Sequence, residues 1–284
     1  MTPPVVNVAT DWWRTSIIDI APGSIRVRGY AIEDLIGRLS FPDMIWLMLR
    51  GELPSAAQGD LLGAVLVAAV DHGPQAPSIA IARMAATCGV GINNAMASGI
   101  NALGDVHGGA GQQCMVLYAA IASRMQTGAI LADAAETELT SRLKSREHIP
   151  GFGHRFHSVD PRAGRLLALL DQAQGDGLVS GRFAGIGRAV EDTLARFKGK
   201  RLPMNIDGAT AVVLAELGFE PEQGRGLFVL SRSVGILSHA YEQSRQGGRI
   251  KGPMPPTIPY RYEGPSPRTL PADRLSESKV GSES

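Results

Sequence analysis

Cysteine, aromatic residues, net charge and long apolar runs are all scarce in this chain of 284 residues. Cys88 and Cys114 lie in apolar, alanine-rich stretches and match no metal-ligand spacing, so we expect reduced thiols. Charged residues make up 19% and the net charge is +1, which argues against a nucleic-acid-binding surface. No run reaches the roughly 18 apolar residues of a membrane span, and the first residues lack a signal-peptide pattern. The sequence therefore predicts a cytoplasmic protein with a small-molecule ligand and no membrane or nucleic-acid partner.

Strand patterns are also scarce, whereas helical periodicity fills most of the chain. Only residues 24–28 alternate well, and they indicate a short hairpin. Residues 41–50 are predicted to form a helix that Ser40 caps and Gly51 ends. The same spacing predicts helices within 32–39, 61–70, 81–104, 112–125, 129–144, 162–174, 183–197, 209–217 and 224–243. The predicted fold class is therefore all-α.

Three glycine-framed segments carry residues suited to acid–base chemistry. They are Val106-His107-Gly108-Gly109-Ala110, Pro150-Gly151-Phe152-Gly153-His154-Arg155 and Asn205-Ile206-Asp207-Gly208. Two histidines and a carboxylate form a set that can generate and quench an enolate. Neighbouring glycines allow tight turns and a close approach of a ligand to the main chain. Together the three segments favour an active site.

Simpler interpretations of these residues also exist. Asp207 could cap the helix expected near residue 209, because Asp is favoured at that position. His154 and His157 are three residues apart, but no third ligand lies nearby in the sequence, so no metal site is predicted. His148 and His239 are expected to have structural roles.

The arginines and lysines leave two alternatives open. Arg162 and Arg232 could be solvated, as most arginines are. However, the residues before Arg232 are mainly apolar, so a buried anionic partner is expected for it. The cluster of Lys198, Lys200 and Arg201 could be a solvated basic face or a contact for phosphates.

An ordered set of motifs resembles the citrate synthase superfamily, and most of all its citryl-CoA lyase branch, which includes the C-terminal module of ATP-citrate lyase. The resemblance covers about residues 25–253. Its motifs are RGYAIEDL at 28–35, GELP at 51–54, DHGP at 71–74, HGGA at 107–110, PGFGHR at 150–155, DPR at 160–162, NIDG at 205–208 and SRSVG at 231–235. Synthases usually carry D-H-E where this chain, like the lyase branch, carries D-H-G-P.

The resemblance implies a role for each motif residue. Asp207 would be the acid or base at the acetyl carbon, His107 would donate to the enolate oxygen, and His154 would exchange a proton with the keto-acid oxygen. The residues implied for the substrate carboxylates are His72, Arg162, Arg232 and Arg249. Those implied for coenzyme A are Arg155, Lys198, Lys200 and Arg201. The coenzyme A thioester would be a substrate, and no permanently bound cofactor is expected.

Two departures from the family pattern concern the ends of the matched region. Only about two dozen residues precede the RGY motif, where synthases carry additional helices. Synthases also place an arginine, contributed across the dimer, where this chain has Gly252 before Pro253. Arg249 or Lys251 is the candidate replacement. The keto acid is therefore left open between oxaloacetate and a substrate with one carboxylate fewer.

The resemblance also implies a domain organisation and an activity. A large helical domain of residues 1–111 and 206–284 would hold a smaller helical domain of residues 112–205, with the site between them. The polar segment 264–284 would be extended or disordered, and a homodimer would form through residues 81–104. The predicted activity is reversible cleavage of citryl-CoA to acetyl-CoA and oxaloacetate. A citrate or 2-methylcitrate synthase, or a catalytically idle acyl-CoA or citrate sensor, is the alternative.

Overall fold

The computed structural model describes residues 12–154 and 157–271, which are mostly helical. The strands are β1 (Ile18–Ala21), β2 (Ser24–Val27) and β3 (Tyr30–Ala31). The helices are α2 (Ile32–Leu35), α3 (Phe41–Arg50), α4 (Ala56–Ala69), α5 (Pro77–Ala86), α6 (Ile92–Asn101), α7 (Ala110–Gln126), α8 (Leu131–Lys144), α9 (Pro161–Gly175), α10 (Arg182–Lys198), α11 (Ile206–Glu216) and α12 (Pro221–Arg245). The all-α fold class is confirmed.

Local sequence signals account for the ends of several helices. The Ser40 hydroxyl accepts the Asp43 backbone N–H at 3.3 Å, and the Asp43 carboxylate accepts the Ser40 N–H at 3.1 Å. This reciprocal capping box starts α3, and Gly51, at φ +86°, ends it. Both predicted ends are therefore confirmed.

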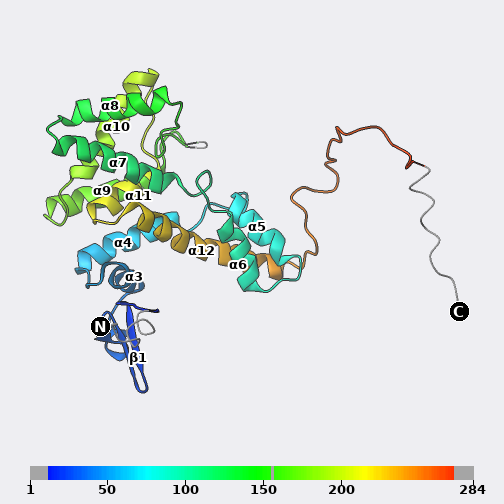
Figure 1. The fold of residues 1–284 in the computed structure, drawn as a ribbon, viewed down its shortest axis with the longest axis horizontal. Helices are drawn as coiled ribbons and strands as arrows, with labels where there is room; N and C mark the ends of the chain where they lie inside the picture. Colours follow the sequence, from blue (N-terminus) through cyan, green and yellow to red (C-terminus); the bar gives the residue numbers. More distant parts are fainter. Residues whose placement is uncertain (1–11, 155–156, 272–284) are drawn as a thin grey trace, which may run out of the picture.

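The N-terminal elements differ in extent from their predictions. Helix α2 covers only residues 32–35 of the predicted 32–39, and Gly37 adopts φ +78° just after it. The predicted hairpin is a three-stranded antiparallel sheet, with Ile20 opposite Ile25 in the first pair. The sheet lies at one end of the molecule, beyond α3 (Figure 1).

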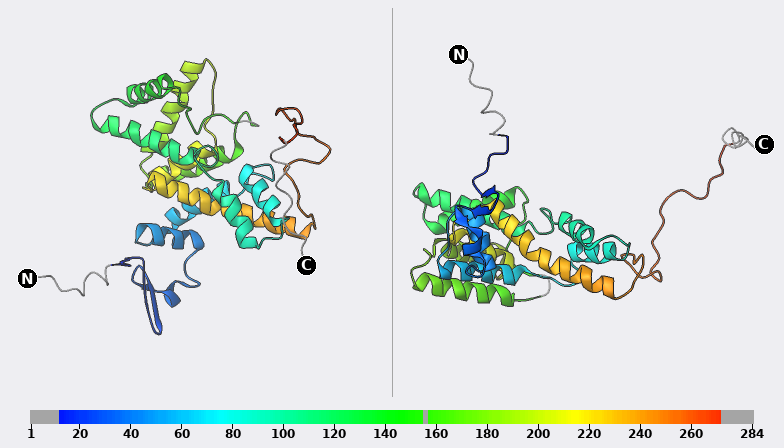
Figure 2. Two further views of the ribbon diagram at one scale, coloured as in Figure 1. Left: turned by 45° about the vertical axis from the view of Figure 1, so that its right-hand side comes forward. Right: turned by 90° about the horizontal axis from the view of Figure 1, so that it is seen from below.

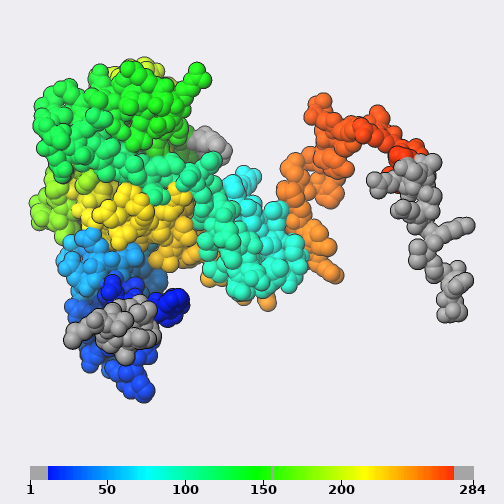
Figure 3. All heavy atoms as spheres, in the orientation of Figure 1, coloured from blue at the N-terminus to red at the C-terminus, as the bar shows by residue number. Residues whose placement is uncertain are grey.

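The main core surrounds α11, whose residues 208–214 are all buried. This helix packs against α7, α9 and α10, and it also contacts α4. The 25-residue helix α12 runs from this body to the packed pair α5 and α6 (Figures 1 and 2). In the space-filling view the pair forms a lobe beside the larger helical body (Figure 3).

The predicted division into two domains remains a prediction. Helix α11, which that division assigns to the large domain, shares its core with α7, α9 and α10 of the predicted insert. After α12 the chain leaves the helical body, and residues 264–271 contain no helix or strand (Figure 2). The remainder of the predicted tail lies outside the described residues. In the part of the chain that is described, no helix is long and apolar enough to cross a membrane.

Candidate active site

Two of the glycine-framed segments cross each other and form the floor of the candidate site. The Gly153 N–H donates to the Pro203 carbonyl at 2.7 Å, and the Asn205 N–H donates to the Gly151 carbonyl at 2.9 Å. The crossing requires glycine, because a Cβ on Gly151 would lie 2.9 Å from the Gly208 Cα atom. This pairing places the loop that carries His154 beside the start of α11.

Asp207 lies in the first turn of α11 and does not cap it. The cap is Asn205, whose side-chain oxygen accepts the backbone N–H groups of Asp207 at 3.0 Å and Gly208 at 3.3 Å. The capping interpretation of Asp207 is therefore wrong, and its carboxylate remains available for chemistry. Burial raises the pKa of Asp207 even though Arg162 and Arg232 oppose the rise. A carboxylate of this kind is a stronger base than a solvated one.

His107 is held as a hydrogen-bond donor. Its Nε2 accepts the backbone N–H of Ser78, in the first turn of α5, at 3.1 Å, and lies 3.0 Å from the Ser78 hydroxyl. Because Nε2 is an acceptor, the neutral ring carries its proton on Nδ1. Burial, and then the charge of Arg232, lower the pKa of His107. The site therefore contains a neutral imidazole with an Nδ1–H group to donate.

His154 lies close to two other histidines. The His157 backbone N–H donates to its Nδ1 at 3.1 Å, which places the proton of the neutral ring on Nε2. The ring of His72 stands edge-on to it, with the centroids 6.1 Å apart. Burial, followed by the charges of Arg162 and Arg232, lowers the pKa of His72. Among the described residues there is no group of three or more His, Cys, Asp or Glu arranged to hold a metal ion.

Arg162 enters the site from the first turn of α9. Its Nε and Nη2 atoms lie 3.1 and 3.0 Å from the two carboxylate oxygens of Asp160, the helix cap. Arg162 also contributes to the pKa shifts of His72 and Asp207, so it faces both. Asp160 is buried and was not predicted as a site residue, although Asp before Pro is a recognisable start of a helix.

Arg232 is buried in the middle of α12, with only 6% of its surface exposed. Its Nε donates to the Ala69 carbonyl at 3.0 Å, and its guanidinium carbon lies 4.9 Å from the centroid of the Phe228 ring. In the described part of the chain no carboxylate comes within 4.0 Å of it. The opposing charges that act on it are those of Asp71 and Asp207, and the buried anionic partner expected for Arg232 remains a prediction.

A hydrogen-bonded chain links the His72 loop to α5 and α12. His239 Nε2 lies 3.3 Å from an Asp71 carboxylate oxygen, and Arg83 donates to His239 Nδ1 at 3.0 Å. Arg83 in turn pairs with Glu242 at 2.6 Å. His239 therefore has the structural role that was expected, as it anchors the residue before His72.

The remaining predicted ligand-binding residues make no hydrogen bond or ion pair with this cluster where they are described. Lys198 and Lys200 are exposed on either side of Gly199, where α10 ends. Arg201 is exposed and pairs with Glu191 at 2.8 Å. Arg249 is exposed beyond α12. Arg155 lies outside the described residues. Their assignments remain predictions.

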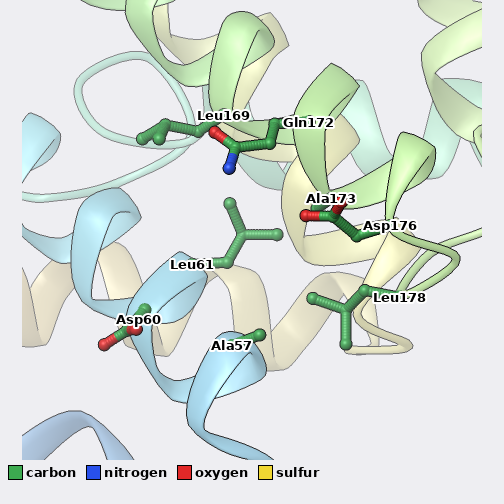
Figure 4. Close-up of a pocket in the computed structure, with 8 residues that line it drawn as sticks. All are labelled: Ala57, Asp60, Leu61, Leu169, Gln172, Ala173, Asp176 and Leu178. Carbon is green, nitrogen blue, oxygen red and sulfur yellow. The ribbon is translucent and has the colours of Figure 1, made fainter.

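A pocket of about 230 Å³ lies between α4 and α9, away from the acid–base residues (Figure 4). Its lining is mainly apolar, with two carboxylates and an amide: Ala57, Asp60, Leu61, Leu169, Gln172, Ala173, Asp176 and Leu178. None of the predicted site residues lines it.

Comparison with known proteins identifies related sequences and folds. A family model described as "Citrate synthase, C-terminal domain" matches residues 5–64 and 57–254. A citrate synthase of Deinococcus radiodurans is 30% identical over 209 residues, which is 72% of this chain and 52% of that protein. The chain spans about half the length of the curated relatives it matches.

Two solved structures are similar over almost the whole chain. The citryl-CoA lyase of Hydrogenobacter thermophilus has a TM-score of 0.83 and 32% identity, and the match covers 93% of this chain and 99% of that one. The ATP citrate lyase of Methanothrix soehngenii, in complex with citrate and coenzyme A, has a TM-score of 0.74 and 21% identity, and the match covers 98% of this chain and 46% of that one. The second likeness shows the fold alone.

Proposed function

The chain belongs to the citrate synthase family, and from this premise we propose that it cleaves citryl-CoA reversibly to acetyl-CoA and oxaloacetate. The observation that carries the proposal is the position of Asp207. Its carboxylate is not used to cap α11, burial raises its pKa, and His154, Arg162 and Arg232 lie within its electrostatic reach. A half-buried carboxylate among cationic and histidine side chains suits the handling of a proton on carbon.

In the cleavage direction, the electron pair of the broken C–C bond passes to the acetyl group. The tertiary hydroxyl of citryl-CoA gives its proton to His154 Nε2, and its oxygen becomes the carbonyl of the keto acid. The bond then breaks, and the pair forms the enolate of acetyl-CoA. The Nδ1–H group of His107 donates to the enolate oxygen, and protonated Asp207 delivers a proton to the enolate carbon. Condensation is the reverse of these steps.

His154 must change its hydrogen bonding during cleavage. With the His157 N–H on Nδ1, the neutral ring is protonated on Nε2, which suits donation to the carbonyl oxygen of a keto acid. Acceptance of the hydroxyl proton at Nε2 requires the neutral ring protonated on Nδ1, so the bond from His157 has to open. The ring then becomes the doubly protonated imidazolium, which is the state that returns the proton in condensation. Cleavage and condensation therefore start from different states of this ring.

Cationic groups on two helices are suited to the substrate carboxylates. Buried Arg232 has no carboxylate within 4.0 Å in the described chain, and Arg162 is oriented by Asp160. A planar guanidinium can pair with a carboxylate through two parallel hydrogen bonds. His72, beside His154, is the third candidate. The proposed contacts for coenzyme A are Lys198, Lys200, Arg201 and Arg155. Arg249 is a further proposed contact for a substrate carboxylate.

Two observations favour a lyase over a synthase. A citryl-CoA lyase shares 32% identity with the chain at a TM-score of 0.83, and D-H-G-P at residues 71–74 resembles the lyase branch. The similarity to a citrate synthase at 30% identity supports the second candidate, a citrate or 2-methylcitrate synthase. The two activities differ in whether the thioester is hydrolysed after condensation.

The decisive experiment measures both products on one preparation. In the first assay citryl-CoA is supplied, and the oxaloacetate formed is measured with a coupled dehydrogenase. In the second assay acetyl-CoA and oxaloacetate are supplied, and the free thiol released is measured with a thiol reagent. The lyase proposal predicts oxaloacetate formation much faster than thiol release. Rapid thiol release with negligible oxaloacetate would favour the synthase. Neither signal, with CoA esters of several lengths, would favour an idle sensor.

A further inference from the structure

Asp160 is a fully buried carboxylate that accepts hydrogen bonds from two helices, α9 and α11. Its side chain has 0% exposure. One oxygen accepts the Arg162 backbone N–H at 3.1 Å and Arg162 Nε at 3.1 Å. The other accepts Arg162 Nη2 at 3.0 Å and the Ile206 backbone N–H at 3.1 Å. Each oxygen thus has two donors, and the carboxylate is fully satisfied.

These contacts exceed what a helix cap requires. A single oxygen on the Arg162 N–H would cap α9. The other bonds orient the guanidinium of Arg162 and bind the first residue of α11, 46 positions further along the chain. Asp207, the predicted base, follows Ile206 directly. The Asp160 carboxylate therefore holds both the start of α11 that carries Asp207 and the side chain of Arg162, which is predicted to bind a substrate carboxylate.

The charge of Asp160 also acts on Asp207. Burial tends to raise the pKa of Asp160, but the hydrogen bonds and charge of Arg162 outweigh it and hold the pKa below its ordinary value. Asp160 is therefore ionised at neutral pH. Its charge contributes to the raised pKa of Asp207, against the opposing effect of Arg162.

We propose that Asp160 is a positioning residue that locks the Arg162 guanidinium and the Asp207 end of α11 in one register. The substrate carboxylate and the reacting carbon are then presented to Asp207 together. The kinetic consequences of this inference rest on the proposed function. The hydrogen bonds of Asp160 from which it is argued lie within the protein and do not depend on that function.

The primary test is Asp160→Asn, which keeps the shape of the side chain and removes its charge. One oxygen is replaced by an amide NH2 group, which faces N–H donors. Arg162 therefore loses an acceptor in either orientation of the amide, and Ile206 loses its acceptor in one of them. We expect turnover to fall by about a hundredfold, the scale for a misplaced catalytic group, together with a higher KM for citryl-CoA. In cleavage Asp207 acts in its protonated form, so its ionisation sets the alkaline limb of the pH–kcat profile. Loss of the negative charge of Asp160 should move that limb to lower pH.

The other groups that act on Asp207 keep their chemical identity in this variant. They are Arg162 on α9, Arg232 on α12, His154 on its loop and Cys114 on α7. Burial raises the pKa of Cys114 to about 12, so this thiol stays neutral through the test. The displaced limb therefore reports the lost charge of Asp160 together with any movement of Arg162, and both follow from the proposed role.

Two further variants separate positioning from simple helix capping. Ser55→Ala removes the cap of α4, which holds none of the site residues, and should lower Tm without moving KM or the alkaline limb. Arg162→Lys keeps both charges and removes the two-atom pairing, so it should raise KM and leave the alkaline limb in place. If Asp160→Asn behaves like Ser55→Ala, the positioning role is refuted. If Asp160→Asn does not fold, an unchanged KM in Arg162→Lys refutes it.

A measurement without substrate distinguishes this inference from the proposed function. The carboxyl 13C resonance of Asp207, assigned with Asp207→Asn, is titrated in the unmodified protein and in Asp160→Asn. We expect a lower titration midpoint in the variant. Absence of turnover in the unmodified protein would overturn the proposed function alone, whereas an unmoved midpoint would overturn the role of Asp160.

Discussion

Gly208→Ala tests whether the crossing of the two loops creates the active site. A Cβ at this position would lie 2.5 Å from the Met204 Cγ atom and would also overlap the Gly151 carbonyl. Ordinary contacts between carbon atoms are about 3.5–4.0 Å, so the added methyl group is about 1 Å too close. Met204 can rotate away, but the Gly151 carbonyl is backbone, and the loop that carries His154 has to move with it.

The expected losses follow from this displacement. A shift of about 1 Å at catalytic groups costs about a hundredfold in rate, and overpacking a core site costs about 1–3 kcal/mol. For a protein of this size each kcal/mol lowers Tm by about 2–4 °C. The measurements are turnover of citryl-CoA and thermal unfolding monitored by circular dichroism.

A matched glycine provides the control. Gly226 is exposed within α12, and a Cβ there would meet nothing within 4 Å. Gly226→Ala should therefore keep full turnover and gain about 0.4–1 kcal/mol of stability. If Gly208→Ala also kept full turnover, the crossing would not be what aligns His154 with Asp207, and the reasoning would be refuted.

Three further predictions concern chemistry, pH and assembly. Asp207→Asn and His154→Ala should each lower turnover at least about a hundredfold and leave the circular dichroism spectrum unchanged, because each removes a positioned acid or base; near-normal turnover in either would contradict the assignment. Because the pKa of Asp207 is raised on folding, its ionisation costs stability as pH rises from its ordinary value of 3.8 through the folded value. Asp207→Asn should thus gain stability over the unmodified protein at pH 7 and lose that advantage near pH 3, and a pH-independent difference in urea denaturation would argue against it. One face of α12 exposes a stripe of apolar side chains that favours pairing with a second copy: Leu230, Val234, Leu237 and Tyr241. Light scattering should therefore report twice the 30.0 kDa mass of the chain. A stable monomer at micromolar concentration would count against a dimer.

Local signals in the sequence determined the helices and the chemical groups. Periodic apolar residues predicted the long helices, and Ser40 and Gly51 predicted the ends of α3. These signals act within one or two turns of chain, so no distant contact is needed to interpret them. The glycine-framed His107, His154 and Asp207 pointed to enolate chemistry, and the ordered motifs pointed to the family that the comparison then established.

Only the tertiary structure decided how these groups are held. Three features depend on atomic positions. They are the cap of α11 by Asn205 rather than Asp207, the hydrogen bond from Ser78 that sets the His107 tautomer, and the hydrogen bond from the Ile206 N–H to Asp160. The absence of a carboxylate beside Arg232 in the described chain also depends on which helices pack around it. The cap of α11 is a local contact, but the long-range contacts of His107, Asp160 and Arg232 join segments 29 to 163 residues apart. The geometry of these long-range contacts is set by close packing of the core, which periodicity and motif spacing do not encode.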